Sequence, residues 1–171
     1  MASVALIVGG ALLAAGWTTA VWVRTGLSSD LRGILDLEFR GLDLAQGIAA
    51  LIVSGLALAI FVIVRRGRGD TRILAVVLLL SGVALVALPA WVALRAEDRA
   101  VEEVAQVVAL SAGISVEEAT ERVRTEPDLA VRTDTTGVWP SIAAGVFVTI
   151  GGVTTLSWIG RRPADPDEDG P

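Results

Sequence analysis

The chain has 171 residues, of which 53% are hydrophobic and 19% are charged, below the roughly 25% charged residues of an ordinary globular protein. Cysteine and histidine are absent, and all 14 basic residues are arginines. This composition excludes a disulfide framework, a thiolate or imidazole metal site, a Cys or His nucleophile and a Schiff-base lysine. The net charge of −5 argues against a nucleic-acid partner.

Four uncharged runs divide the chain, and they extend from Ala2 to Val23, Leu44 to Val64, Ile73 to Leu94 and Thr135 to Gly160. Each is longer than the roughly 18 apolar residues that indicate a transmembrane helix. So short a chain has too little other sequence to cover four such helices in a soluble core. We therefore predict an all-α integral membrane protein, a four-helix transmembrane bundle with a small extracytoplasmic cap.

This division predicts a membrane domain over residues 1–160 and a disordered acidic cytoplasmic tail over residues 161–171. The first run is too long for the apolar core of a signal peptide, and no Lys or Arg precedes it, so we expect it to remain as a span. The spans are expected at about 3–23, 44–64, 73–94 and 138–159, with outer loops 24–43 and 95–137 and an inner loop 65–72.

Arginine density predicts the orientation in the membrane. Loop 65–72 has four arginines in eight residues, and short basic loops stay in the cytoplasm. The two outer loops hold eight arginines in total, but loop 95–137 also carries ten acidic residues. Density, rather than the raw count, therefore predicts a multi-pass protein of the bacterial plasma membrane with both termini in the cytoplasm.

The first outer loop alternates apolar and charged residues from Leu35 to Arg40, which is the period of a half-buried strand. We expect a short strand or hairpin there. An interfacial helix from Asp30 to Phe39 is the alternative, because the apolar residues of this segment also partly suit a helical face.

The second outer loop is predicted to form two helices. The first, from Ala96 to Leu110, places Val101, Val104, Val107 and Val108 on one face, and it is either separate or a continuation of the third span. Gly113 breaks this pattern. Ser115 and Glu118 then form a capping box for a second helix that ends near Pro127, with Val116, Ala119 and Val123 facing one way.

The predicted spans contain no charged residue, which argues against a pump or an ion-coupled transporter. A serine hydrolase in the membrane needs a His or Lys-like base, and the chain has neither. We therefore expect no enzyme activity, no catalytic residue, no cofactor and no metal. The spans are rich in Gly, Ala and Ser, which allows close helix packing within the bundle or self-association with a second copy.

Three tryptophans mark the outer ends of the first, third and fourth spans, and these are Trp22, Trp91 and Trp139. Tryptophan belts commonly anchor a protein at the lipid headgroups. The alternative is an aromatic vestibule with Arg24, Arg95 and Arg99 at its rim, in which rings and guanidinium groups together hold an anionic aromatic ligand or an acidic side chain of a partner.

Several short segments resemble one family in their order along the chain. They are Gly16-Trp17 and Trp22-Val23-Arg24, Gly41-Leu42-Asp43-Leu44-Ala45, the apolar Ile73 to Leu78 after an Arg-Gly-rich loop, and Trp139-Pro140. The chain resembles the tryptophan-associated transmembrane proteins of high-GC Gram-positive bacteria. This resemblance implies a four-span protein of unknown biochemical role whose gene lies beside tryptophan-biosynthesis genes, and it supplies no catalytic residues.

Two functions from different classes fit this sequence. The first is a non-enzymatic accessory module whose partners are the lipid bilayer and another envelope membrane protein or a second copy. The second is a permease, or a permease subunit, for an aromatic or apolar solute. A continuous polar cavity to the middle of the membrane favours the permease, whereas a bundle packed closely by its glycines favours the accessory module.

Overall fold

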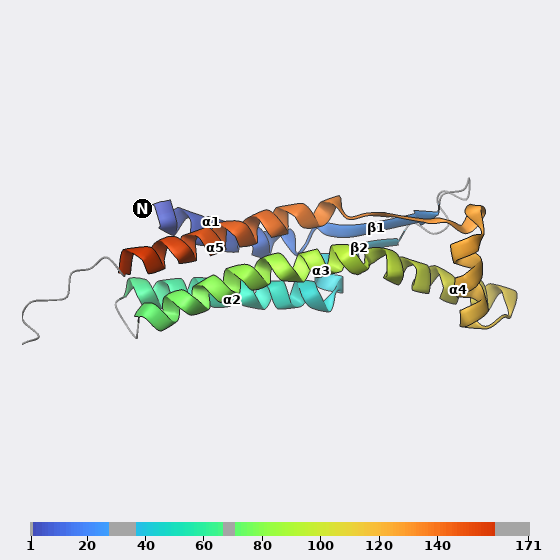
Figure 1. The fold of residues 1–171 in the computed structure, drawn as a ribbon, viewed down its shortest axis with the longest axis horizontal. Coiled ribbons are helices and arrows are strands. Elements are labelled where there is room, and N and C mark those ends of the chain that lie inside the picture. Colours follow the sequence, from blue (N-terminus) through green and yellow to red (C-terminus); the bar gives the residue numbers. More distant parts are fainter. Residues whose placement is uncertain (1, 28–36, 67–70, 160–171) are drawn as a thin grey trace, which may run out of the picture.

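The computed structural model describes residues 2–27, 37–66 and 71–159, and these form five α-helices and one small sheet (Figure 1). The predicted tail lies outside the described residues. The helices are α1 (Ala2–Trp17), α2 (Ala45–Arg65), α3 (Thr71–Ala112), α4 (Val116–Thr125) and α5 (Trp139–Ile159). The strands are β1 (Val21–Leu27), β2 (Leu37–Arg40) and β3 (Val131–Asp134), and the short 3-10 turns are η1 (Gly41–Asp43), η2 (Pro127–Leu129) and η3 (Thr136–Val138).

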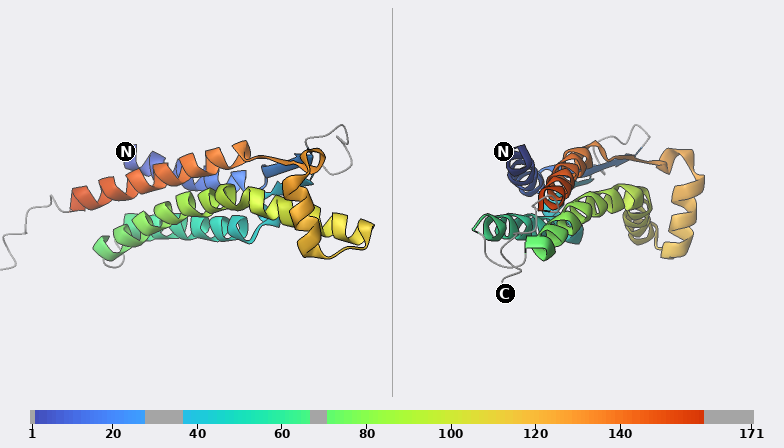
Figure 2. Two further views of the ribbon diagram at one scale, coloured as in Figure 1. Left: turned by 45° about the vertical axis from the view of Figure 1, so that its right-hand side comes forward. Right: turned by 60° about the vertical axis from the view of Figure 1, so that its left-hand side comes forward.

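The long helices lie side by side; the sheet lies beside the second half of α3, beyond the ends of α1, α2 and α5, and α4 lies at the end of α3 (Figure 1). We call this end the cap end and the opposite one the far end. The cap comprises residues 21–27, 37–40 and 95–138. Within it, α4 lies across the end of α3 rather than along it (Figure 2).

Three of the described helices, α2, α3 and α5, are long and apolar enough to cross a membrane. Helix α1 has 16 residues and is about 24 Å long. The predicted first span of residues 3–23 is therefore wrong for residues 18–23, which are not helical. The hydroxyl groups of Thr18 and Thr19 donate to the carbonyl oxygens of Ala15 and Gly16 in the last turn of α1. The chain then enters β1 at Val21.

Small residues bring the helices of the bundle close together, with α5 between α1 and α3 and with α2 packed against both of these. A Cβ atom on Gly145 of α5 would lie 2.7 Å from the backbone of Leu85 in α3, and one on Gly10 of α1 would lie 2.8 Å from the Ala144 carbonyl oxygen. Helix α2 buries Ala50, Ser54 and Ala57. The predicted packing role of the small residues is therefore seen at these contacts.

The cap is built on α3, which continues from the predicted third span as one helix to Ala112. The alternative that the helix over 96–110 prolongs this span is thus confirmed. The sheet has the antiparallel order β2-β1-β3. Strand β2 supports the strand expected near Leu35 to Arg40, and the alternative helix is wrong for residues 37–39, while residues 28–36 lie outside the described part.

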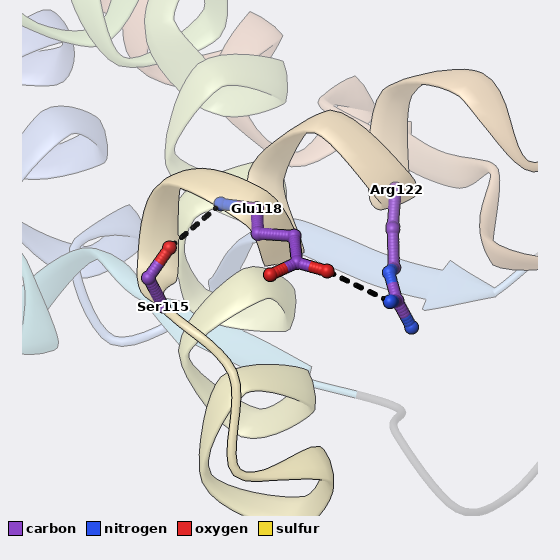
Figure 3. Close-up of polar contacts among 3 residues, drawn as sticks. All are labelled: Ser115, Glu118 and Arg122. Atoms are coloured by element: carbon purple, nitrogen blue, oxygen red, sulfur yellow. Dashed lines mark hydrogen bonds and ion pairs between the residues drawn. The ribbon is translucent and has the colours of Figure 1, made fainter.

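Helix α4 begins as the capping motif predicts. Gly113 takes a left-handed φ of 66°, and the Ser115 hydroxyl oxygen accepts from the Glu118 N–H at 3.2 Å (Figure 3). The second half of the box differs, because the Glu118 carboxylate instead accepts from the Arg122 guanidinium at 2.8 Å. Ala119 and Val123 are buried against α3. Val107 and Val116, which were expected on the apolar faces of these helices, are each 43% exposed.

A first prediction concerns the contact between α3 and α5. Gly145→Ala should destabilise the bundle by about 1–3 kcal/mol, because the new methyl group meets backbone atoms that cannot rotate away. Thermal unfolding of the purified protein in detergent measures the effect. The matched control is Gly55→Ala, since a Cβ atom at Gly55 has no neighbour within 4 Å. Equal stability of the two variants would contradict the close packing.

Candidate functional site

Four segments meet around one tryptophan where the bundle joins the cap. Trp22 of β1 is fully buried, and its indole N–H donates to the Trp17 carbonyl oxygen at 2.9 Å. The indole N–H of Trp17 in turn donates to the Gly137 carbonyl oxygen at 2.7 Å. We call the group of Trp17, Trp22, Gly41 and Gly137 the collar. It links the end of α1 to the segment that begins α5.

The two glycines of the collar are required by close backbone approach. A Cβ atom on Gly41 would lie 2.6 Å from the Thr18 carbonyl oxygen and 2.7 Å from the Trp22 ring. A Cβ atom on Gly137 would overlap the Val21 carbonyl oxygen. The Gly41 N–H also donates to the Ala20 carbonyl oxygen at 3.1 Å. The start of α2, through η1, is therefore fixed against the end of α1.

The three tryptophans that the sequence singled out have different surroundings. Trp22 lies in the core, so it is neither an interfacial anchor nor part of an exposed binding site. Trp91 and Trp139 are 50% and 63% exposed. The approach of Gly145 to Leu85 and Val86 puts antiparallel α5 and α3 in a register that brings Trp139 to about the level of Trp91. These two rings therefore mark one level at the cap end.

The three arginines are also separated. Arg24 forms an ion pair with Glu38 at 3.0 Å on the exposed face of the sheet. The Arg95 guanidinium lies 5.0 Å from the centre of the Trp91 ring and 3.9 Å from the Asp98 carboxylate. Arg99 lines a cleft on the other side of the sheet. Because neighbouring strand residues point to opposite faces, Arg24 and the cleft residue Val23 lie on opposite faces.

This cleft lies between the sheet and α3 and has a volume of about 50 Å³. Its walls are mostly apolar, and the two charged residues among them are one helical turn apart. Burial raises the pKa of Glu103, against the opposing effect of nearby Arg99. The lining residues are Val23, Phe39, Leu44, Val92, Ala96, Arg99, Ala100 and Glu103.

The exposed face of the sheet carries a cross-strand row of charges. Arg24 lies opposite Glu38 of β2 and opposite Asp134 of β3. The Asp134 carboxylate accepts from the Thr136 N–H at 2.9 Å. The hydrogen bonds from Thr136 lower the pKa of Asp134, and the charge of Arg24 lowers it further.

The sequence patterns did not single out Trp17, Gly41, Gly137, Phe39 or Glu103 as parts of a site. Trp17 and Gly41 stand in segments that carry the family resemblance, and Phe39 stands in the alternating segment. Their contacts, however, are with residues far away in the sequence. Of the six residues predicted for an outer-face site, the structure brings Trp91 and Arg95 into direct contact, and it places Trp22 in the core.

A second prediction separates the collar from a membrane anchor. Trp22→Ala should destabilise the protein by about 3–5 kcal/mol, because it removes a fully buried indole and leaves a cavity where bundle and cap join. Trp139→Ala, at a ring that is 63% exposed, is the control and should cost far less. Hydrogen exchange of β1 and of the start of α2 measures the loss of stability. Similar protection in both variants would contradict the role of the collar.

A third prediction concerns pH. Because the pKa of Asp134 is lowered in the folded protein, its charge stabilises the cap above the ordinary value of 3.8, and this contribution is lost as pH falls through the folded pKa. Asp134→Asn should therefore reduce hydrogen-exchange protection of β3 near neutral pH, and the difference from the natural protein should shrink below about pH 3.8. Glu121→Gln, on exposed α4, is the control. A difference that grows toward acid pH contradicts the assignment.

Comparison with known proteins gives one family. The family model of the tryptophan-associated transmembrane proteins matches residues 4–167. Comparison with curated proteins and with solved structures finds no match. The matched range includes every described span, the collar and the cap. The chain therefore belongs to the tryptophan-associated transmembrane protein family.

Proposed function

We propose that this membrane protein is a non-enzymatic accessory module that presents its cap to another protein of the bacterial envelope. The observation that carries the proposal is a closely packed bundle beneath a structured, charged cap. In this proposal, the word tryptophan in the family's description refers to neighbouring genes, and it does not identify a ligand of the chain.

The packing of the bundle argues against a solute pathway. Backbone approaches at Gly82 of α3 and Gly145 of α5 leave no room for a Cβ atom, and one at Gly152 of α5 would lie 3.1 Å from the Leu79 backbone. The buried Ser141 hydroxyl of α5 has no partner among the described residues, but other helix hydroxyls are used locally: Ser54 donates to the Ala50 carbonyl oxygen at 2.7 Å, and Ser81 donates to that of Val77 at 2.9 Å. Such hydroxyls line no polar route, so the permease is the weaker alternative.

The cap has the properties of an interaction module. Helix α3 carries it about 27 Å beyond Leu94, at about 1.5 Å for each of 18 residues. Leu110 is 87% exposed at its tip, with Val107 and Val116 each 43% exposed. Apolar side chains exposed away from the bilayer, with charged residues around them, are typical of protein-binding surfaces.

In this proposal α1 is a fourth span, the cap lies outside the cell, and both termini lie in the cytoplasm. Leu12 of α1 is 57% exposed, as suits a lipid-facing side chain. Helix α1 is shorter than the roughly 30 Å of hydrocarbon, but its cap end reaches the level of the collar, so the shortfall falls at the far end. At that end lie Arg65, Arg66 and Arg72, and the proposal puts this end on the cytoplasmic side.

The topology is tested with single cysteines, because the natural chain has none. A membrane-impermeant maleimide applied to intact cells should label Ser111→Cys in the cap and should not label Arg66→Cys at the far end until the cells are lysed. Both positions are exposed in the structure, so access to the reagent decides the result. Labelling of residue 66 in intact cells, or of residue 111 only after lysis, overturns the orientation.

The function is tested by cross-linking and transport. A cross-linker on Ser111→Cys should give one discrete adduct with an envelope protein in native membranes, and the same reagent on Arg66→Cys after permeabilisation should not give that adduct. Vesicles containing the purified protein should take up labelled tryptophan or indole no faster than protein-free vesicles. Uptake above that background supports the permease instead, and absence of any cap adduct removes the accessory role.

A further inference from the structure

Strand β2 is an edge strand. The sheet has the order β2-β1-β3, so in the described part of the chain no strand pairs with the other side of β2. A free edge offers backbone N–H and C=O groups to an additional strand. The segment Glu38-Phe39-Arg40 carries opposite charges on either side of one aromatic ring.

The cleft lies directly beside this edge. Phe39 pairs with Val23 across the two strands, and both line the cleft together with α3. Its volume of about 50 Å³ is about a third of that of an engineered cavity of roughly 150 Å³ that binds benzene. The space therefore suits one short aliphatic side chain, and it is too small for an indole ring or a lipid chain.

The charges around the cleft lack strong partners. Among the described residues, no ion pair within 4 Å holds Arg40, Arg99 or Glu103, and burial raises the pKa of Glu103. Only Glu38 is paired, with Arg24 at 3.0 Å, and both of these side chains remain at least half exposed. The edge therefore presents an unpaired cation at Arg40 and a solvent-accessible anion at Glu38.

The direction and the charges of β2 argue against a second copy as the occupant, since a parallel in-register pair of β2 strands would set Glu38 against Glu38 and Arg40 against Arg40. The strands run along the same axis as the helices, and β2 leads through η1 into α2, so it runs toward the bundle (Figure 1). Two copies inserted the same way into one membrane both have β2 running toward the bilayer. An antiparallel pair of β2 strands, in which Glu38 of each faces Arg40 of the other, is therefore not available to them.

We infer that the free edge of β2 and the adjoining cleft bind an extended segment of a different membrane protein, one that leaves the bilayer beside the cap. Such a segment runs away from the membrane, as β1 does after α1, and pairs antiparallel with β2. An acidic residue then lies opposite Arg40, a short aliphatic residue opposite Phe39 with its side chain in the cleft, and a basic residue opposite Glu38. The recognised order is acidic, aliphatic, basic, and the inference rests on the proposed function.

The test uses the full-length protein in lipid nanodiscs and two fluorescent peptides of equal composition. The matched peptide is Thr-Val-Glu-Val-Arg-Val-Thr, and the swapped peptide exchanges its Glu and Arg. Two favourable cross-strand charge pairs against two unfavourable ones should make the matched peptide bind on the order of ten-fold more tightly by fluorescence anisotropy. Replacing the central Val of the matched peptide by Trp should abolish this advantage, because the cleft cannot hold an indole.

The specificity is tested by exchanging charges on the protein. The double variant Glu38→Arg with Arg40→Glu should reverse the preference and favour the swapped peptide. The matched control is Glu121→Arg with Arg124→Glu on exposed α4, away from the sheet, and it should leave the preference unchanged. Because a reversal requires a folded cap, failure to fold cannot imitate it.

Several results overturn the inference: no binding of either peptide, equal binding of both, equal binding of the Trp peptide, or a reversal produced by the α4 control variant. These outcomes leave the proposed function standing if the cap still forms its cross-linked adduct. If the adduct is also absent, the function fails as well. A preference seen in detergent and lost in nanodiscs assigns the cleft to lipid and likewise rejects the strand.

Discussion

The structure depends on the burial of Trp22 between the bundle and the cap. An indole with no exposed surface must have backbone close around it, and Gly41 and Gly137 allow that approach because they carry no side chain. The hydrogen bond from Trp17 to Gly137 then joins the end of α1 to the residues just before α5. The end of one helix and the starts of two others are thus fixed by one group of contacts, and the three strands project from it in a defined direction.

Helix packing follows the same physical rule at a larger scale. In lipid, apolar side chains gain little by leaving their surroundings, so association depends on close backbone contact and local hydrogen bonding. Gly82, Gly145 and Gly152 supply the contact between α3 and α5, while the hydroxyls of Ser81 and Thr149 donate to carbonyl groups of their own helices. This close packing argues against a solute pathway through the bundle. The accessory role is therefore the better supported of the two proposed functions.

The sequence predicted the elements whose signal is local. Helices α2 and α5 follow from uncharged runs, and α4 follows from Ser115 and Gly113. The end of α1 was missed because hydropathy cannot separate a helix from a strand within the uncharged run from Ala2 to Val23. Strand β3 was missed because its four residues pair with β1, more than 100 positions earlier in the chain. The site was predictable in part for the same reason, since the ring of Trp91 meets Arg95 one turn away whereas Trp22 is buried by distant segments.

The segments that carry the family resemblance are distant in sequence, yet three of them meet at the collar. The end of α1 brings Trp17, the start of β1 brings Trp22, and the turn before α2 brings Gly41, while Gly137 lies two residues before the Trp139-Pro140 segment that begins α5. This arrangement gives the motifs a structural meaning, because they specify how the cap is joined to the bundle. A cap held rigidly on three helices has a fixed direction relative to the membrane. In the inferred pairing at β2, that fixed direction would determine which strands can approach the edge, so a motif that serves folding would also restrict the choice of partner.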